Sequence, residues 1–315
     1  MNRLTLRSDA LLFITALIWG SAFVAQRVGM DYVGPFTFNG VRFALGTLVL
    51  LPVICLRRAS SLKRAADRPV RSTLAGGLLA GFVLFAGASL QQAGIVYTTA
   101  GHAGFITGLY VVLVPILGTM MNQRTSTGTW AGAVLAVAGL YLLCVSEGLT
   151  VAAGDGLVLA GAFFWAAHVL VIGCFAPKAD SYELAFLQFA ACAVLSLGVA
   201  AFTEPIELGP IGAGAVPILY GGVMSVGIAY TLQVVGQRHA PSSHAAIILS
   251  LESVFAALGG WLLLDEHLTG RQLAGCSLML AGMLASQLWG TRAAGGTGDR
   301  GAKPEEPELP AAVEG

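Results

Sequence analysis

The chain has 315 residues, of which 56% are hydrophobic and only 11% are charged. Soluble globular proteins carry about 25% charged residues, so these charges are too few to cover a water-soluble fold of this length. The mean hydropathy of +0.77 agrees, and 17 basic residues balance 17 acidic ones. Soluble enzymes, disordered chains and nucleic-acid binders are therefore excluded, and the composition predicts a polytopic membrane protein.

The charges fall in short clusters between apolar stretches of about 20 residues, the length of a helix that crosses a bilayer. In chain order, the sequence predicts membrane helices at 10–29, 35–56, 73–96, 102–121, 128–146, 156–175, 181–202, 212–235, 241–264 and 270–290. The 41 glycines are compatible with these helices, because glycine lets membrane helices pack closely. The predicted fold class is an all-α integral membrane protein with ten transmembrane helices.

The lysines and arginines predict the orientation of the chain. If the N-terminus is cytoplasmic, all but three of the 17 fall in cytoplasmic segments, the exceptions being Arg27, Arg42 and Arg271. The opposite loops around 147–155 and 204–207 contain acidic residues and no basic one. We therefore expect both termini to be cytoplasmic.

The two ends of the chain are expected to lie outside the membrane. Arg3 and Arg7 before an apolar run would suit a signal peptide, but the same run recurs later in the chain. This recurrence favours a first membrane helix after a cytoplasmic segment, 1–9. Residues 291–315 predict a disordered cytoplasmic tail. The five cysteines show neither metal nor disulfide spacing, so no metal or cofactor is expected.

Sliding the sequence along itself indicates an internal duplication. The matches that compositional bias does not explain are, at an offset of 146, Asp9 with Asp155 and Trp19 with Trp165, and, at an offset of 142, Gln91 with Gln233 and His102 with His244. The same registers place Arg42 on Gln188 and Tyr110 on Glu252. An offset of 143 aligns glycines of the fifth and tenth predicted helices, which we interpret as a packing seam.

The duplication divides the chain into two five-helix repeats, 10–146 and 156–290. Because five is odd, the second repeat enters the membrane from the opposite side, and the two repeats are expected to be inverted. Inverted repeats recur in secondary transporters, where the substrate binds near the midplane between them. Exchanging the conformations of the two repeats would turn an outward-facing cavity into an inward-facing one.

Several stretches resemble the EamA-type bacterial permeases of the drug/metabolite transporter superfamily. They are Trp19–Phe23, Phe38–Phe43, Phe105–Pro115, Leu251–Ala257 and the exit Leu263–Glu266. The resemblance covers about residues 9–290 and implies a multi-pass permease of the bacterial inner membrane. It also implies a midplane site lined by helices 1, 3, 4, 6, 8 and 9. One departure is Pro115 in the fourth helix. The repeat has Ala257 at the aligned position, so a proline kink need not be symmetric.

Two charged residues within predicted helices need a physical reason, because a charge in the bilayer centre costs about 2.5 kcal/mol or more. Glu252 is expected either to carry protons or balance a cationic substrate, or else to serve structurally, as a partner of Arg42 or in a helix-packing hydrogen bond. Arg42 is expected to extend to the interface or tie down loops. The functional alternative for Arg42 is to bind a substrate carboxylate through two hydrogen bonds.

Uncharged polar and aromatic residues complete the candidate substrate site. Trp19 and Trp165 occupy equivalent depths in the two repeats and would form cavity walls that stack on aromatic or cationic solutes, although packing alone is the alternative. The other candidates are Gln91, Tyr110, His168, Tyr230 and Gln233. Of these, His168 either titrates during transport or is a neutral, hydrogen-bonded core residue.

The sequence shows no catalytic constellation and no GxxxxGK(S/T) phosphate loop, so neither enzyme activity nor ATP hydrolysis is expected. We expect a secondary active transporter that exports a small metabolite, such as an amino acid or amine, by alternating access. Two alternatives stay open: an intramembrane enzyme acting on a lipid or prenyl substrate with Arg42, Glu252 and His168, and a passive facilitator. The sequence does not decide between a monomer and a homodimer.

Overall fold

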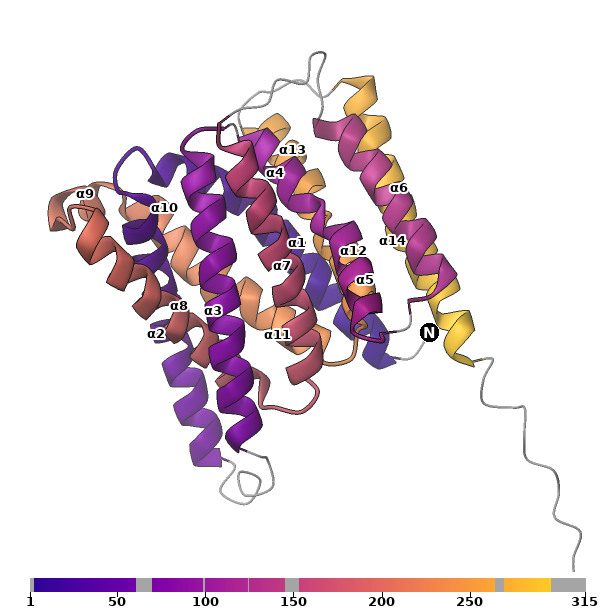
Figure 1. Cartoon of the computed structure of the whole chain (residues 1–315), viewed down its shortest axis with the longest axis horizontal. Coiled ribbons are helices and arrows are strands. Elements are labelled where there is room, and N and C mark those ends of the chain that lie inside the picture. The colour runs from indigo at the N-terminus through magenta and orange to yellow at the C-terminus, as the bar shows by residue number, and fades with distance from the viewer. Residues whose placement is uncertain are drawn as a thin grey trace, which may run out of the picture.

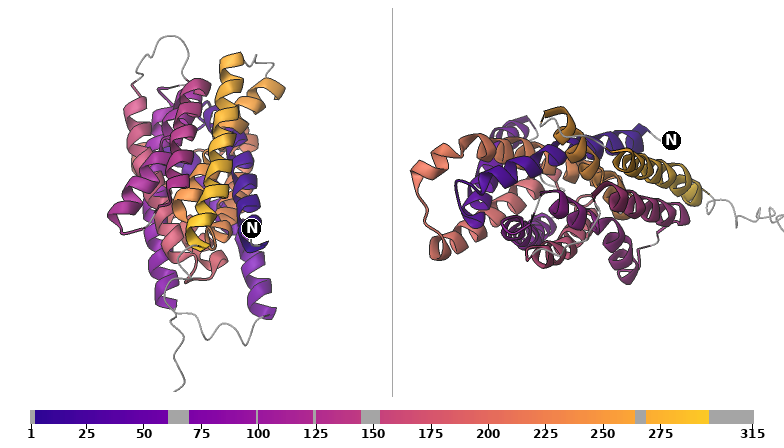
Figure 2. Two further views of the ribbon diagram at one scale, coloured as in Figure 1. Left: turned by 90° about the vertical axis from the view of Figure 1, so that its right-hand side faces the viewer. Right: turned by 90° about the horizontal axis from the view of Figure 1, so that it is seen from above.

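The structure, a computed structural model, describes residues 3–60, 70–98, 100–123, 125–144, 153–263 and 269–295. Every regular element among these residues is helical, and the long helices form one bundle (Figures 1 and 2). The acidic loop at Glu147, the exit at 264–266 and the tail beyond 295 lie outside the described residues. The N-terminus and the last turn of α14 lie at the same end of the bundle (Figure 1).

The helices follow the predicted order, with differences at their ends. They are α1 Arg3–Gly29, α2 Pro35–Ser60, α3 Val70–Ile95, α4 Ala100–Gly108, α5 Tyr110–Met120, α6 Thr127–Cys144, α7 Asp155–Phe175, α8 Ser181–Thr203, α9 Leu208–Ala213, α10 Ala215–Leu219, η2 Tyr220–Tyr230, α11 Thr231–Gln237, α12 Ser242–Leu249, α13 Glu252–Leu263 and α14 Gly270–Gly295. Helix α1 begins seven residues earlier than expected, and α14 continues into the predicted tail. The reason is that hydropathy locates the apolar part of a helix and not its end.

The described helices are those of a multi-pass membrane protein. Seven helical segments are long and apolar enough to cross a membrane, and two shorter apolar segments span Thr127–Leu142 and Ser242–Leu258. Many large apolar side chains on the outside of the bundle are exposed, such as Phe82, Phe163 and Val194. An apolar exterior is the expected surface of a protein whose solvent is lipid.

Two of the predicted helices are interrupted at equivalent positions. The break between α4 and α5 lies at Leu109, and the break between α12 and α13 lies at Ser250 and Leu251, 142 residues later. At both breaks a backbone N–H bonds the carbonyl three residues earlier, from Leu109 to Ile106 and from Leu251 to Ile248, each at 3.2 Å. These are single 3₁₀ turns. Pro115 lies beyond the first break, so the interruption is symmetric although the proline is not.

A third predicted helix, 212–235, is a composite of α10, the π-helix η2 and α11. The wider turn of a π-helix is uncommon and is frequent at functional sites. Polar groups of α1 bond this stretch: Thr15 Oγ1 donates to the Ala229 carbonyl at 3.1 Å, and Trp19 Nε1 donates to the Ser225 carbonyl at 3.3 Å. Its repeat counterpart, α3, is a continuous helix, so the two halves differ here.

The most extensive helix contacts join the first half of the chain to the second. Helix α6 packs along α14 on one flank of the bundle, and α3 and α2 pack on α7 and α8 at the other side (Figure 1). Helix α1 packs on η2, α11, α12 and α13, whereas α7 packs on α3, α4 and α5. The two halves therefore interlock and share one core.

The contact between α6 and α14 is made by glycines, as the packing interpretation requires. A Cβ atom on Gly132 would lie 2.6 Å from the Gly282 carbonyl oxygen, and one on Gly139 would lie 2.6 Å from the Gly275 carbonyl oxygen. A Cβ atom is not tolerated this close to backbone. The backbones of α6 and α14 therefore touch directly, as in other small-residue membrane interfaces.

Gly139→Ala is expected to lower the thermal midpoint of the purified protein. The added methyl group would force α6 and α14 apart, and overpacking of this kind costs about 1–3 kcal/mol. Gly198→Ala in α8 is the matched control, because a Cβ there meets nothing within 4 Å. Alanine is the better helix former, so the control is expected to be neutral or stabilising. Equal midpoints for the two variants would contradict the seam.

Candidate functional site

A small cavity lies at the centre of the bundle, and we call it the chamber. Its volume is about 40 Å³, above the roughly 10–15 Å³ that a cavity needs to hold one water molecule. All nine residues that the sequence singled out line it: Trp19, Arg42, Gln91, Tyr110, Trp165, His168, Tyr230, Gln233 and Glu252. They come from both halves of the chain.

Gln91 of α3 connects three other helices through hydrogen bonds. Its Oε1 accepts from Trp165 Nε1 at 2.7 Å and from Thr107 Oγ1 at 3.3 Å, and its Nε2 donates to Gln26 Oε1 at 3.2 Å. The short bond from Trp165 joins the two halves at the chamber wall. Gln91 and Trp165 therefore hold each other in fixed orientations.

Tyr110 and Glu252 occupy equivalent positions in the two halves and meet across the chamber. The Tyr110 hydroxyl donates to Glu252 Oε1 at 3.3 Å, and both side chains are buried. Each residue is the first of its helix, directly after one of the two breaks. The interrupted helices thus place a carboxylate in the chamber. Glu252 is the only acidic residue among those that line it.

Aromatic rings form one side of the chamber around Tyr230. The ring of Trp19 lies 4.5 Å from that of Tyr230 between centroids, and the ring of Trp165 stacks on it at 6.2 Å with an interplanar angle of 25°. The imidazole of His168 meets Tyr230 edge-on at 6.1 Å. The equivalent tryptophans of the two halves therefore flank one tyrosine, and this wall offers ring faces to an apolar or cationic group.

Arg42 is buried rather than extended towards the end of its helix. Its side chain is 2% exposed, its Nε donates to Asn39 Oδ1 at 3.0 Å, and its guanidinium lies over the rings of Phe38 and Phe43. The expectation that it extends to the interface is therefore wrong. Arg42 and Glu252 line the same chamber but form no ion pair, so the alternative in which each is the structural partner of the other is also excluded.

Within the part of the chain that the structure describes, two buried polar atoms of chamber residues have no hydrogen-bond partner: His168 Nδ1 and Gln233 Oε1. The other ring nitrogen of His168 donates to Gln188 Oε1 at 2.8 Å, and the Gln233 amide nitrogen donates to Gln237. When the imidazole is neutral, both unpartnered atoms are acceptors. Buried unpartnered groups are rare in folded proteins, and these two would suit a ligand that donates hydrogen bonds.

Six further residues line the chamber that were not among the candidates. They are Phe23, Gln26, Thr107, Val169, Ser225 and Leu249. Gln26 follows Trp19 by seven residues and lies on the same face of α1. This spacing could have placed Gln26 among the candidates. Thr107 and Ser225 carry small hydroxyl groups that membrane helices tolerate, so their sequence positions gave no signal.

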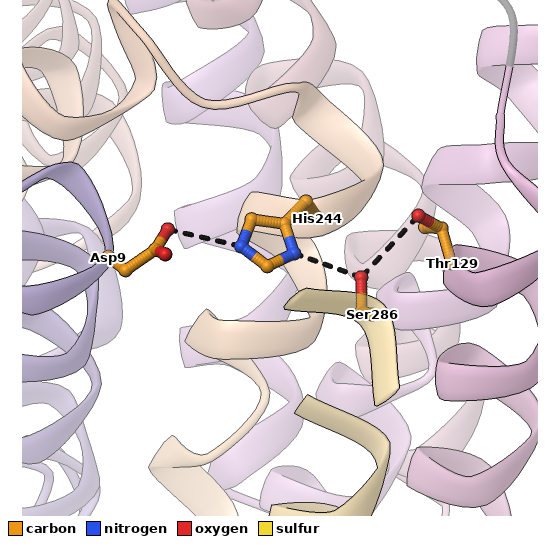
Figure 3. A network of polar contacts seen from close by, with 4 residues as sticks. All are labelled: Asp9, Thr129, His244 and Ser286. Carbon is orange, nitrogen blue, oxygen red and sulfur yellow. Dashed lines mark hydrogen bonds and ion pairs between the residues drawn. The ribbon is translucent and has the colours of Figure 1, made fainter. Parts of the chain in front are cut away.

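A second polar cluster ties the halves together at the end of the bundle that holds the N-terminus. Asp9 Oδ1 lies 3.0 Å from His244 Nε2, and His244 Nδ1 lies 2.9 Å from Ser286 Oγ. Ser286 Oγ donates in turn to Thr129 Oγ1 at 3.4 Å. Figure 3 shows this row, which connects α1, α12, α14 and α6. Asp155, the repeat counterpart of Asp9, accepts from Thr98 at 2.6 Å.

Comparison with known proteins identifies two matching segments of one family. Residues 6–145 and residues 152–286 each match the model of the EamA-like transporter family. An uncharacterized transporter of Archaeoglobus fulgidus is 34% identical over 285 residues, which cover 90% of this chain and 86% of the relative. The uncharacterized transporter YoaV of Bacillus subtilis is 22% identical, covering 85% of this chain and 92% of that protein.

A solved crystal structure is also similar to the chain. It superposes with a TM-score of 0.73 at 20% sequence identity and covers 91% of this chain and 98% of its own. At this level of identity the likeness concerns the fold.

Proposed function

The chain belongs to the EamA-like transporter family, and from this premise we propose that it is a secondary active transporter that exports a small metabolite such as an amino acid or amine. It acts by alternating access between two inverted five-helix repeats, 10–146 and 156–290. It resides in the inner membrane of a bacterium with both termini in the cytoplasm. The location of the basic residues and the common end at which α1 begins and α14 ends support this topology.

The packing supports ten membrane spans in two inverted repeats. The spans are α1, α2, α3, α4 with α5, α6, α7, α8, α10 with η2 and α11, α12 with α13, and α14. If each helix is replaced by its counterpart in the other repeat, the helix contacts are reproduced. The contact of α1 with α12 and α13 corresponds to the contact of α7 with α4 and α5, and the pair of α6 and α14 corresponds to itself. The glycine contacts obey the same exchange, since Gly132 and Gly139 align with Gly275 and Gly282 in sequence.

The observation that carries the proposal is that a basic and an acidic side chain, Arg42 and Glu252, line the chamber without an ion pair between them. The Arg42 guanidinium suits a carboxylate, and Glu252 with the acceptors of His168 and Gln233 suits an ammonium group. A zwitterionic amino acid supplies both groups, and the aromatic wall at Tyr230 would contact its side chain. The chamber must widen to admit it, as alternating access requires.

The geometry favours transport over intramembrane catalysis. An enzyme would need its ionisable groups to act on one another or on one reacting atom. Here Arg42 bonds Asn39, Glu252 bonds Tyr110 and His168 bonds Gln188, so none of the three groups bonds another although all three line the chamber.

Thermal stabilisation of the detergent-solubilised protein tests the substrate class. A ligand that binds only the folded state raises the thermal midpoint by mass action. We expect amino acids to raise it more than the matched amines that lack the carboxylate and the matched acids that lack the ammonium group. Equal stabilisation by all three forms would contradict recognition by two charges.

Counterflow in proteoliposomes separates a transporter from a passive facilitator. Vesicles loaded with an unlabelled amino acid are expected to accumulate the labelled form transiently above its outside concentration, because alternating access exchanges one substrate for another. A facilitator with a continuous pore would only equilibrate the label. Equilibration without overshoot would therefore replace alternating access by passive diffusion.

Trp19→Ala and Trp165→Ala are each expected to weaken ligand binding roughly tenfold, because loss of an aromatic contact of up to about 2 kcal/mol changes the Kd by that order. Trp130→Ala is the matched control, since Trp130 lies on α6 and does not line the chamber. Binding is measured from the ligand dependence of the thermal midpoint of each folded variant. Unchanged affinity in both chamber variants would remove the tryptophans from the site.

A further inference from the structure

A second cavity, of about 210 Å³, opens at the end of the bundle that holds the N-terminus. It lies where the first turns of α1 and α8 meet the last turns of α2 and the residues that follow α11. None of the residues that line it lines the chamber. It is therefore a separate feature, larger than the chamber, and the transport mechanism above does not use it.

Basic side chains from three parts of the chain converge on this cavity. Arg7 of α1, Arg57 of α2 and Arg238 after α11 line it together with His239, and Asp180 is the only acidic residue among the lining residues. Asp180 Oδ1 accepts from two backbone N–H groups of α8, and its Oδ2 lies 3.7 Å from Arg57. Neither Arg7 nor Arg238 pairs with a carboxylate among the described residues. The cavity is therefore left with an excess of positive charge.

Ser181 provides an independent sign that a ligand is expected here. It is the first residue of α8, only 5% exposed, and it lines the cavity. Its Oγ is buried without a hydrogen-bond partner, which is rare for a buried hydroxyl group. Beside it, the Tyr182 ring lies 4.4 Å from the Arg57 guanidinium and orients it. A hydroxyl donor and several guanidinium groups are the donors that bind phosphate oxygens.

We propose that this cavity binds the phosphate of an anionic phospholipid headgroup. Basic pockets between membrane helices on the cytoplasmic side are suited to such headgroups, and Arg7, Arg238 and Ser181 supply the donors. Leu4 and Leu11 of α1 line the same cavity, and Leu4 is half exposed. An acyl chain attached to the phosphate would therefore find an apolar surface next to the charge. The bound lipid would bridge α1, α8 and the end of α11, joining the two halves.

The test measures the thermal midpoint of the delipidated protein with phosphatidylglycerol, with phosphatidylcholine of the same acyl chains, and with inorganic phosphate. Phosphatidylglycerol is expected to raise the midpoint, and phosphatidylcholine to do so less, because its choline places a positive charge near the arginines. Arg7→Gln/Arg238→Gln is expected to lose at least roughly tenfold in affinity for phosphatidylglycerol, as expected for lost charged hydrogen bonds. Arg27→Gln, at the other end of α1, is the matched control and is expected to retain it.

Ser181→Ala separates lipid binding from folding. Because the Ser181 hydroxyl bonds nothing in the structure, its loss is expected to leave the midpoint without lipid unchanged and to lower the lipid affinity several-fold. Stabilisation by inorganic phosphate that is lost in the double arginine variant would support a phosphate site filled from solution. No shift with any of the three compounds, or full lipid stabilisation of the double arginine variant, would overturn the proposal.

Discussion

Glu252→Gln is expected to abolish transport driven by a pH gradient, whereas counterflow of the substrate persists at lower apparent affinity, because the amide oxygen still accepts a hydrogen bond from the ammonium group. The substitution keeps the shape of the side chain and removes its ability to exchange a proton. Driven uptake and counterflow are both measured in the same proteoliposomes. The expected loss is complete, because Glu252 is the only carboxylate in the chamber.

The physical reason is competition for one acceptor. Glu252 is buried and has a single hydrogen bond, from the Tyr110 hydroxyl at 3.3 Å, so no fixed cation neutralises it. A buried carboxylate needs either a proton or a cationic partner, and a substrate ammonium group and a proton cannot both satisfy it. Exchange of one for the other at each opening of the chamber would couple export to proton entry.

Two controls make the result specific. Glu207→Gln changes an exposed carboxylate outside the chamber and is expected to have no effect. Tyr110→Phe removes the hydrogen bond but keeps the ionisable group, so driven transport is expected to persist. Intact driven uptake in Glu252→Gln would contradict proton carriage, and complete loss of counterflow would show that the substrate cannot bind without the carboxylate, which would contradict the separation of binding from coupling.

Composition, the cost of buried polar groups and self-comparison together predicted most of the chamber. Polar residues in an apolar helix are costly, so Gln91, His168 and Glu252 could be selected from the sequence without knowledge of their neighbours. The repeat then paired Trp19 with Trp165. Residues that carry no such cost, such as Thr107, gave no signal, although Thr107 bonds Gln91 in the chamber.

The irregular helices could not be predicted, because hydropathy depends on the side chains and does not report how the backbone is hydrogen-bonded. The breaks at Leu109 and at Ser250 and Leu251 contain no proline, and Pro115, the proline that suggested a kink, lies six residues beyond the first break. The π-helix of Tyr220–Tyr230 likewise has an ordinary apolar sequence. Arg42 was misplaced for a related reason. Its distance from the end of the helix suggested an interfacial position, whereas Phe38, Phe43 and Asn39 enclose it.

Asp9→Ala is expected to lower the free energy of unfolding by about 1–3 kcal/mol, the usual cost of leaving a buried hydrogen-bonding group without its partner. Asp9 and His244 are both more than nine-tenths buried, and their atoms lie 3.0 Å apart. Such a loss lowers the thermal midpoint by roughly 2–4 °C per kcal/mol in a domain of 150–250 residues and by less in a chain of 315. Asp31→Ala, in the turn that follows α1, is the control, because its pair with Arg27 is exposed and contributes at most about 1 kcal/mol.

A double-mutant cycle of Asp9→Ala with His244→Ala shows whether this contact joins the two halves energetically. Because the residues belong to different halves, their coupling measures how firmly this end of the bundle is closed, and we expect it to exceed about 1 kcal/mol. If the losses of stability in the two single variants simply add in the double variant, Asp9 and His244 are not coupled. The row of contacts through Ser286 and Thr129 would then contribute only packing. In alternating access, a strong tie at this end must break whenever the chamber opens there. The described conformation, with this row intact (Figure 3), would then be one in which that end is closed.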